Sequence, residues 1–168
     1  MNIKEKTAVA LGYFDSVHIG HKAVIETAVN SAFAPAVFTF VSKNGKNGET
    51  PLLEAEKKAD LLASLGVKYC FMPDFSDIKN MSGRTFFEDI IVKKMNASAI
   101  VCGEDFRFGN NAECSVSDLK VFAADFNVNL TVIPLIKVDG KKVSSTEIKR
   151  LIKEKRNSSA EALLGRKI

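Results

Sequence analysis

The chain has 168 residues, of which 46% are hydrophobic and 26% charged; this composition is typical of globular domains and argues against disordered, collagen-like or membrane-spanning chains. The length suits one domain covering residues 1–168. The net charge is +4, and residues 141–168 hold nine Lys and Arg but only three Glu. This basic segment has no aromatic residue, so no nucleic-acid partner is expected, whereas a solvated helix face and a phosphate-facing role are equally open.

Short apolar runs rich in β-branched residues alternate with longer segments of helical period, which predicts an α/β fold with a parallel sheet. In chain order, the pattern predicts a strand over 7–11, a helix over 19–32, a strand over 36–41, a helix over 54–65, a strand over 67–72, a helix over 82–95, a strand over 99–103, a helix over 115–126, a strand over 129–135 and helices over 145–155 and 159–164. Gly66 ends the second helix and Ser82 caps the third. Residues 42–51, SKNGKNGETP, are expected to form a mobile surface loop.

The N-terminal residues and the cysteine pattern bear on the cellular compartment of the protein. Residues 1–6 are polar and charged, no apolar run of signal-peptide type follows them, and no stretch of about 18 apolar residues occurs. We therefore expect a cytoplasmic protein without membrane contact. Cys70, Cys102 and Cys114 form no CxxC pattern, which argues against a zinc site or disulfide framework. Cys70 and Cys102 lie in apolar runs and are expected to act as small hydrophobic residues, whereas Cys114, in a polar loop, is the candidate for reactivity.

Parallel sheets bind ligands at the carboxyl ends of their strands, which directs attention to three junctions. The first, residues 12–21, reads GYFDSVHIGH and holds both histidines of the chain. At a helix start, positions i and i+3 share a face, so His18 and His21 can point at one ligand, and Gly20 lets a phosphate approach the backbone. The helix N-terminus adds free N–H groups and partial positive charge.

These features predict a triphosphate site in which the imidazoles stabilise charge during in-line attack on phosphorus. The histidines lack an HExxH pattern and a nearby third ligand, so no protein metal site is expected. The structural alternative is a pair of capping or surface histidines.

The second junction, residues 101–109, reads VCGEDFRFG. Asp105 can hold a ligand hydroxyl, Phe106 and Phe108 can wall an aromatic ring, and Arg107 can pair with a phosphate or carboxylate. A structural role is equally open, with the aromatic rings in the core and Arg107 bound to Asp105 or Glu104.

The third junction, residues 143–150, reads VSSTEIKR, so Ser144, Ser145 and Thr146 open a basic helix. A helix cap explains one hydroxyl but not three in a row. The cluster predicts a second anion cradle, directed at the β- and γ-phosphates.

These motifs, in this order, resemble the FMN adenylyltransferase domain of the bacterial bifunctional riboflavin kinase/FAD synthetase family. GYFDSVHIGH is similar to the nucleotidyltransferase signature GxFDGxHxGH, GEDFRFG to the VGxDFRFG stretch, VSSTEIK to ISSTxIR, and residues 163–166 to LLGR. The likeness spans residues 8–166. It implies a Rossmann-like nucleotidyltransferase fold and transfer of AMP from ATP to FMN, giving FAD and pyrophosphate, with Mg²⁺ bound to ATP.

The resemblance also implies the roles of individual residues. His18 and His21 are the expected catalytic residues. The expected ATP-binding residues are Gly12, Tyr13, Phe14, Asp15, His18, Gly20, His21, Ser144, Ser145, Thr146 and Lys149. The expected FMN-binding residues are Gly103, Asp105, Phe106, Arg107 and Phe108.

The sequence departs from the family pattern in several places. Ser16 replaces a Gly, and Lys149 stands where the family has an Arg; Arg150 lies about 100° further round the helix and is not an equivalent. Residues 41–47 lack the Pro and His of the family's substrate-enclosing loop. Because the chain ends just after LLGR, no riboflavin kinase activity is expected.

Two alternative functions stay open: transfer to another phosphorylated acceptor, such as a sugar, polyol or pantetheine phosphate, and a non-catalytic role as a nucleotide or flavin sensor. The sequence gives no indication of the oligomeric state.

Overall fold

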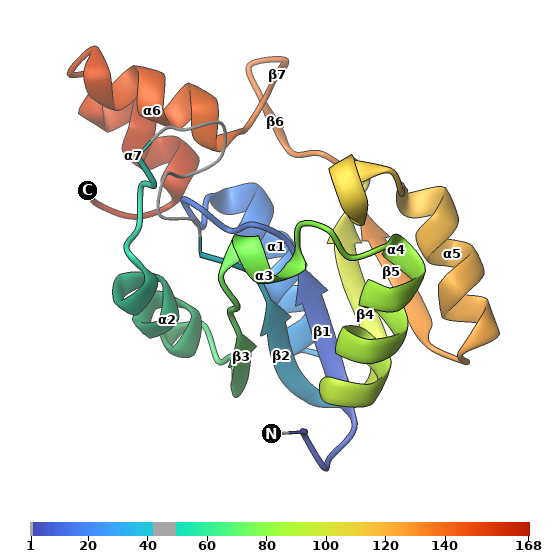
Figure 1. Cartoon of the computed structure of the whole chain (residues 1–168). Helices are drawn as coiled ribbons and strands as arrows, with labels where there is room; N and C mark the ends of the chain where they lie inside the picture. The colour runs from blue at the N-terminus through green and yellow to red at the C-terminus, as the bar shows by residue number, and fades with distance from the viewer. Residues whose placement is uncertain (1, 42–49) are drawn as a thin grey trace.

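A five-stranded parallel sheet in the order β3-β2-β1-β4-β5 forms the centre of the computed structural model (Figure 1), which describes residues 2–41 and 50–168. Its strands are β1 (Thr7–Leu11), β2 (Ala34–Phe38), β3 (Tyr69–Phe71), β4 (Ala97–Gly103) and β5 (Asn129–Ile133). The predicted α/β, Rossmann-like class is therefore confirmed. Most of the loop predicted over 42–51 lies outside the described residues.

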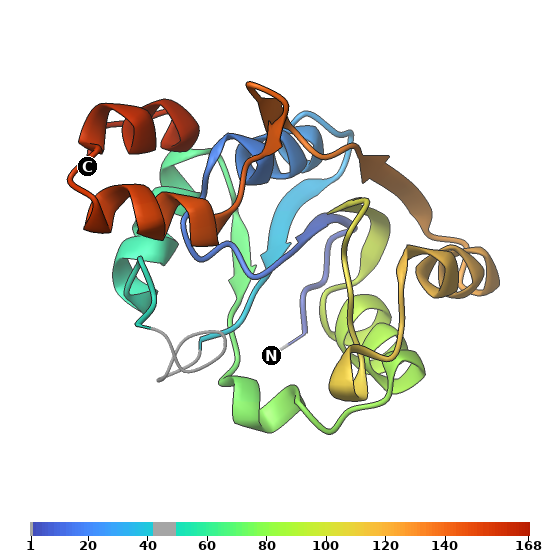
Figure 2. The ribbon, with the colours of Figure 1, turned by 90° about the horizontal axis from the view of Figure 1, so that it is seen from above.

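Helices cover both faces of this sheet (Figure 2). They are α1 (Ile19–Val29), α2 (Ala55–Ser64), α3 (Phe75–Ile78), α4 (Gly83–Thr85), the π-helix η2 (Phe86–Lys94), the 3₁₀ turn η3 (Asn110–Ala112), α5 (Val116–Asp125), α6 (Ser145–Lys153) and α7 (Asn157–Leu164). A short antiparallel hairpin, β6 (Lys137–Val138) and β7 (Lys141–Lys142), precedes α6.

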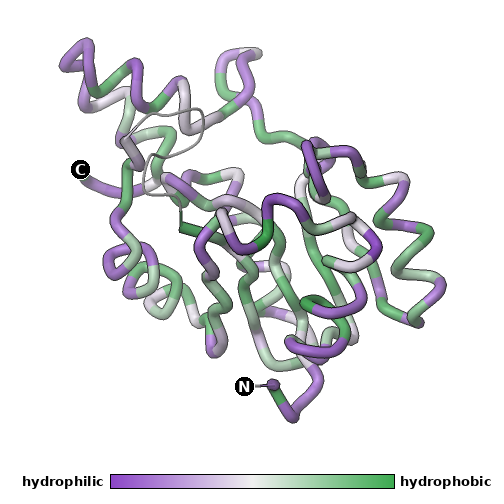
Figure 3. The backbone as a smooth tube through the Cα atoms, viewed as in Figure 1, coloured by the Kyte–Doolittle hydropathy of each residue, from purple (hydrophilic) through white to green (hydrophobic). Residues whose placement is uncertain are grey.

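The alternation of side chains along β1 divides the core into two layers. Ala8 and Ala10 pack on the α1 side with Val24 and Ile25, whereas Val9 and Leu11 face the layer formed with η2 and α5. All five residues of β1 are buried, as expected for a central strand covered on both faces. Figure 3 shows hydrophobic positions along these strands and polar positions on the outer helix turns.

A third, smaller cluster joins α6 to α7 and consists of Ile148, Leu151, Ala160 and Leu164. In Figure 1 the two helices lie beyond the carboxyl end of the sheet. We refer to residues 144–168 as the C-terminal arm. This arrangement places the predicted third junction at the same end of the sheet as the first two.

Several predicted boundaries are wrong by a few residues. The helix predicted over 19–32 ends at Val29, because the backbone leaves helical geometry at Asn30, where φ is −83° and ψ is 6°. The predicted Ser82 cap is confirmed, since its hydroxyl accepts from the Thr85 N–H at 3.1 Å. The helix that follows is widened to π geometry over Phe86–Lys94, which the apolar spacing does not reveal.

The predicted environments of the three cysteines agree only in part with the structure. Cys102 is buried, as predicted, but Cys70 is exposed because β3 is the edge strand of the sheet. Cys114 is partly buried, and this burial raises its pKa, which disfavours the thiolate that reactivity requires. Within residues 2–41 and 50–168, none of the helices has the length and apolar character needed to cross a membrane.

Candidate active site

The three predicted junctions meet at one end of the sheet. β1 and β4 are neighbours, and the chain order reverses between them, which is where open α/β sheets bind ligands. The Ser16 hydroxyl lies 2.9 Å from the Ser145 hydroxyl, and Lys149 Nζ lies 3.1 Å from the Asp15 carboxylate. These two contacts join the first junction to the third, across more than 120 residues of sequence.

The turn before the histidines has an unusual backbone. Phe14 and Val17 have φ angles of 49° and 45°, in the left-handed region that bulky residues rarely adopt. Both side chains are buried, and the Tyr13 carbonyl between β1 and Phe14 accepts from Thr39 Oγ1 at 2.6 Å and Lys58 Nζ at 3.0 Å. Strain of this kind persists only where surrounding contacts enforce it, and it is concentrated at functional sites.

Phe14 also explains the glycine that precedes it. A Cβ on Gly12 would come within 2.8 Å of the Phe14 ring. The first glycine of the motif therefore makes room for a buried ring as well as for any ligand that approaches the backbone.

The two histidines form a stacked pair at the start of α1. Their ring centroids are 3.6 Å apart and their planes differ by 11°. The His21 N–H donates to His18 Nδ1 at 3.1 Å, so the proton of a neutral His18 ring lies on Nε2. A Cβ on Gly20 would lie 3.0 Å from His18 Cε1. Gly20 therefore gives space to the His18 ring, and His18 caps α1 through Nδ1 while its Nε2 stays outside this cap bond.

Burial makes both rings neutral near pH 7. The pKa of His18 is lowered to about 4, mainly by loss of hydration; the charges of Lys142 and Arg166 also lower it, whereas a backbone hydrogen bond and Asp105 partly oppose this shift. Burial also lowers the pKa of His21 to well below its ordinary value, with smaller contributions from His18, Lys58 and Lys142. His21 Nδ1 is inaccessible to solvent and has no hydrogen-bond partner among the described residues.

Asp15 is a buried carboxylate that connects the histidine turn to Leu52 and to Lys149 on α6. It is 2% exposed, its Oδ1 accepts from the Leu52 N–H at 3.1 Å, and its Oδ2 faces Lys149. These partners fix the carboxylate and draw the ammonium of α6 toward the histidine turn.

Lys58 belongs to this region and was not predicted from the sequence. Its side chain is buried, and its ammonium donates to the carbonyls of Tyr13 and Phe40 at 3.0 and 3.3 Å. Burial lowers its pKa to about 8, although Asp15 acts in the opposite direction. The available signal was its spacing, because Lys58 lies one turn before Leu62 on the buried face of α2.

The second junction places its aromatic residues in different environments. Phe108 is buried in the core against Phe86 and Phe122, whereas Phe106 is half-buried and stacks on Phe108 with centroids 5.6 Å apart. Phe106 is therefore the more accessible ring of the two, and Phe108 packs beneath it.

The polar residues of this junction are fixed by neighbouring backbone and by the hairpin. Arg107 donates to the Ala112 carbonyl at 3.2 and 2.9 Å, so the predicted structural partners Asp105 and Glu104 are wrong. Asp105 instead pairs with Lys142, at the end of β7. A Cβ on Gly103 would lie 3.2 Å from Asp105 Oδ1, so the glycine leaves space for this carboxylate.

Lys142 reaches the site through a hairpin that was not predicted. Asp139 and Gly140, at its turn, both have positive φ, 51° and 75°. An Asp-Gly pair between two extended dipeptides is a known signal for such a turn, and it was present in the sequence. The hairpin adds a cation next to the second junction and the histidines.

The three hydroxyls that open α6 have different positions. Ser144 caps the helix by accepting from the Glu147 N–H at 3.2 Å. Ser145 contacts Ser16, and Thr146 is exposed at the N-terminus of α6. One hydroxyl thus serves the helix, one joins the two junctions, and one faces solvent where an anion can approach.

Candidate metal ligands do not cluster within residues 2–41 and 50–168. No group of three or more His, Cys, Asp and Glu side chains there is placed to hold a metal ion. Asp15, the carboxylate nearest the histidine turn in sequence, is already engaged by Lys149 and Leu52.

Comparison with known proteins gives the family. The profile of the FAD synthetase family matches residues 1–147. The chain belongs to this family. A bifunctional riboflavin kinase/FMN adenylyltransferase of Listeria monocytogenes is 32% identical over 168 residues, covering 94% of this chain and 53% of the relative. A protein named FAD synthetase from the same organism is 28% identical, with 94% of this chain and 68% of the relative covered. The chain spans about half the length of this Listeria bifunctional relative and of one from Buchnera aphidicola.

Solved structures agree with this fold. A Streptococcus pneumoniae structure described as a macrolide-efflux protein has a TM-score of 0.87 and 27% identity, covering 99% of this chain and 67% of that one. A pantoate-beta-alanine ligase from Francisella tularensis has a TM-score of 0.60 and 18% identity, covering 96% and 79%. The second likeness concerns the nucleotidyltransferase-like fold alone.

Proposed function

We propose that this chain is an FMN adenylyltransferase, which transfers AMP from ATP to the phosphate of FMN and releases pyrophosphate. The observation that carries the proposal is the convergence of three motifs on one end of the sheet, joined by the Ser16–Ser145, Asp15–Lys149 and Asp105–Lys142 contacts. Family membership supports the choice of FMN as acceptor. The proposed domain is residues 1–168, acting in the cytoplasm.

In this proposal an oxygen of the FMN phosphate attacks the α-phosphorus of ATP in line with the departing pyrophosphate. The chain then supplies position and charge stabilisation more than covalent chemistry. The stacked, neutral histidines donate N–H groups to non-bridging oxygens as charge develops there, with His18 Nε2 as the donor of the first ring. Mg²⁺ enters as part of the Mg·ATP substrate and is held by phosphate oxygens and water.

The remaining site residues bind the two substrates. Lys149 and the N-terminus of α6, with Ser145 and Thr146, lie on the side proposed for the distal phosphates. Phe106 is the proposed contact for the flavin ring, supported from behind by Phe108. Asp105 and Lys142 border the proposed path of the acceptor phosphate.

The test is to incubate the purified chain with ATP, Mg²⁺ and FMN and to separate the flavins by chromatography. FAD and pyrophosphate should form in equal amounts. Parallel incubations with pantetheine phosphate, glycerol phosphate and a sugar phosphate address the alternative acceptors. Product from one of these but not from FMN would transfer the function to another acceptor, and binding of both ligands without any product would indicate a sensor.

A further inference from the structure

Arg166, in the last motif of the chain, contacts the histidine turn directly. Its Nη1 donates to the Val17 carbonyl at 3.0 Å and its Nη2 to the Ser16 carbonyl at 2.8 Å. These are the two peptide groups immediately before His18. Val17 is also one of the two left-handed residues of the turn. The guanidinium therefore bonds the strained backbone at the point where it leads into the catalytic pair.

The backbone at the end of α7 places Arg166 next to the histidine turn. Gly165 has a φ of 63°, and a Cβ there would lie 3.0 Å from Ile19 Cγ2, in the first turn of α1. Lys22, also on α1, donates to the Gly165 carbonyl at 2.9 Å. The glycine thus lets α7 end against α1, and the next residue, Arg166, turns back onto the loop.

The partners of Arg166 distinguish it from a surface ion pair. It is partly buried, which lowers its pKa, and it bonds two carbonyls with the two arms of one planar group. An ammonium has no such fixed fork and cannot reproduce both bonds in the same plane. The contact therefore specifies backbone shape as well as charge.

We propose that Arg166 is a positioning residue for the His18–His21 pair: it fixes the Ser16 and Val17 peptides so that His18 keeps its bond to the His21 N–H and directs Nε2–H toward the phosphate. The inference rests on the proposed adenylyltransfer for its kinetic consequence. It places a determinant of the active site nearly 150 residues away in sequence, at the end of the C-terminal arm.

The experiment uses Arg166→Met, Arg166→Lys and Arg166→Ala, with Arg156→Met as a matched control. Arg156 is at the other end of α7, and its side chain lies 3.9 Å from Glu154, away from the turn. Because the chain has only two histidines, ¹⁵N spectra of the imidazoles report the tautomers of the pair without any substrate. kcat and KM for ATP and FMN, and the melting temperature, are measured on the same samples.

We expect Arg166→Met to lower kcat roughly tenfold to a hundredfold, because small displacements of catalytic groups have effects of this size, with KM changed less than about threefold. The His18 signals should move from a single Nε2–H tautomer toward a mixture. Arg166→Lys should recover part of kcat, and guanidinium ion, well below denaturing concentration, should restore part of it to Arg166→Ala. Arg156→Met should match the wild type.

Wild-type kcat and unchanged imidazole signals in Arg166→Met would overturn the inference. So would a loss of kcat that follows the melting temperature and is not restored by guanidinium, since that is the result of a purely structural contact. If the wild type forms no FAD, the proposed function fails, and the imidazole spectra alone decide: a tautomer change in Arg166→Met supports the positioning role, and an unchanged spectrum contradicts it.

Discussion

Burial of the His18–His21 pair determines what these side chains can do. With His18 at a pKa of about 4 and His21 also well below its ordinary value, both rings are uncharged donors over the range in which ATP is fully ionised. His18 Nδ1 accepts a hydrogen bond from the backbone N–H of His21, so the only N–H donor of the neutral His18 ring is at Nε2 and has a fixed direction. A neutral donor of fixed orientation gains most when charge develops opposite it, which is a property of the transition state rather than of bound substrate.

His18→Ala and His21→Ala should therefore act on turnover more than on binding. Removal of one such donor lowers kcat by roughly a hundredfold or more in comparable sites, and we expect the Kd for ATP to change far less. Steady-state kinetics and isothermal titration on each variant separate the two quantities. A variant that bound ATP much more weakly but retained its kcat would refute the assigned role.

The same lowered pKa should make folding stability depend on pH. In the folded chain the pKa of His18 is about 4, against an ordinary 6.5; between these values the unfolded chain binds more protons, so the free energy of unfolding falls as the pH falls. At about pH 5 the loss from His18 alone is about 2 kcal/mol relative to about pH 7. Urea denaturation at the two pH values measures it. His18→Gln should lose less over this interval, and an identical loss would contradict the assignment.

The secondary structure shows which elements a sequence pattern can and cannot predict. All five strands of the sheet and the longer helices were found, because their apolar periods reflect burial directly. The π geometry of Phe86–Lys94 was missed because it shifts hydrogen bonds without changing which residues are apolar. The β6–β7 hairpin was missed because its strands have two residues each, too short for any period.

The candidate site was predictable to the same limited extent. The sequence located the histidine, acceptor and hydroxyl motifs, and parallel-sheet topology explains why they meet. It could not show that Lys58, Lys142 and Arg166 also converge there, since each acts through main-chain carbonyls or a carboxylate remote in sequence. Every residue has a main-chain carbonyl, so a cation that bonds carbonyls requires no particular residue type as its partner and leaves no motif in the sequence.

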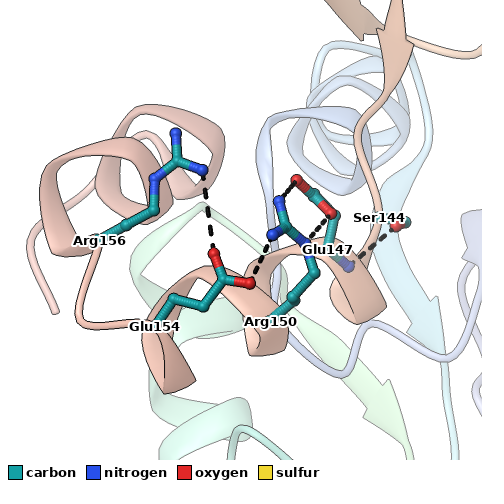
Figure 4. Close-up of polar contacts among 5 residues, drawn as sticks. All are labelled: Ser144, Glu147, Arg150, Glu154 and Arg156. Carbon is teal, nitrogen blue, oxygen red and sulfur yellow. Dashed lines mark hydrogen bonds and ion pairs between the residues drawn. The ribbon is translucent and has the colours of Figure 1, made fainter.

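Helix α6 presents its two adjacent cations in different directions. Lys149 faces Asp15 and the histidine turn. Arg150 instead lies between two carboxylates, those of Glu147 and of the C-cap Glu154 (Figure 4). Its Nε is 2.9 Å from Glu147 and its Nη1 2.6 Å from Glu154. The outward position of Arg150 follows from the helical turn between consecutive residues.

Substitutions of these two residues should therefore have different effects. Lys149→Ala should weaken ATP binding, and added salt should weaken the wild-type interaction as well, since the ammonium is partly exposed. Lys149→Arg should tighten ATP binding or raise kcat, because a guanidinium can bond two phosphate oxygens. Arg150→Ala should leave both quantities near wild type. Titrations of ATP at two salt concentrations test this, and an essential Arg150 would show that the motif is assigned one residue out of register.

Over the whole molecule, the C-terminal arm is a distinct structural layer beside the candidate site. Its apolar cluster, centred on Ile148 and Leu164, is separate from the two clusters that enclose the sheet. It meets the histidine turn through the Ser16–Ser145, Asp15–Lys149 and Arg166 contacts. Polar contacts of this kind stabilise less than a continuous core, so the arm should open at lower free energy than the sheet does.

Hydrogen exchange can measure this difference. In the ligand-free chain, amides of α6 and α7 should exchange faster than those of β1 and β4, which lie in the buried centre. In the proposed binding mode Mg·ATP contacts both the turn before α1 and the start of α6, so it should slow exchange in the arm. A ligand at about 100 times its Kd can add about 2.7 kcal/mol of stability. Amides of α5, on the far side of the sheet from α1, serve as the internal control and should be little affected. If the arm exchanged no faster than the central strands, or if nucleotide protected α5 as strongly as α6, then the arm would be part of one cooperative unit and not a separately docked layer that substrate binding secures.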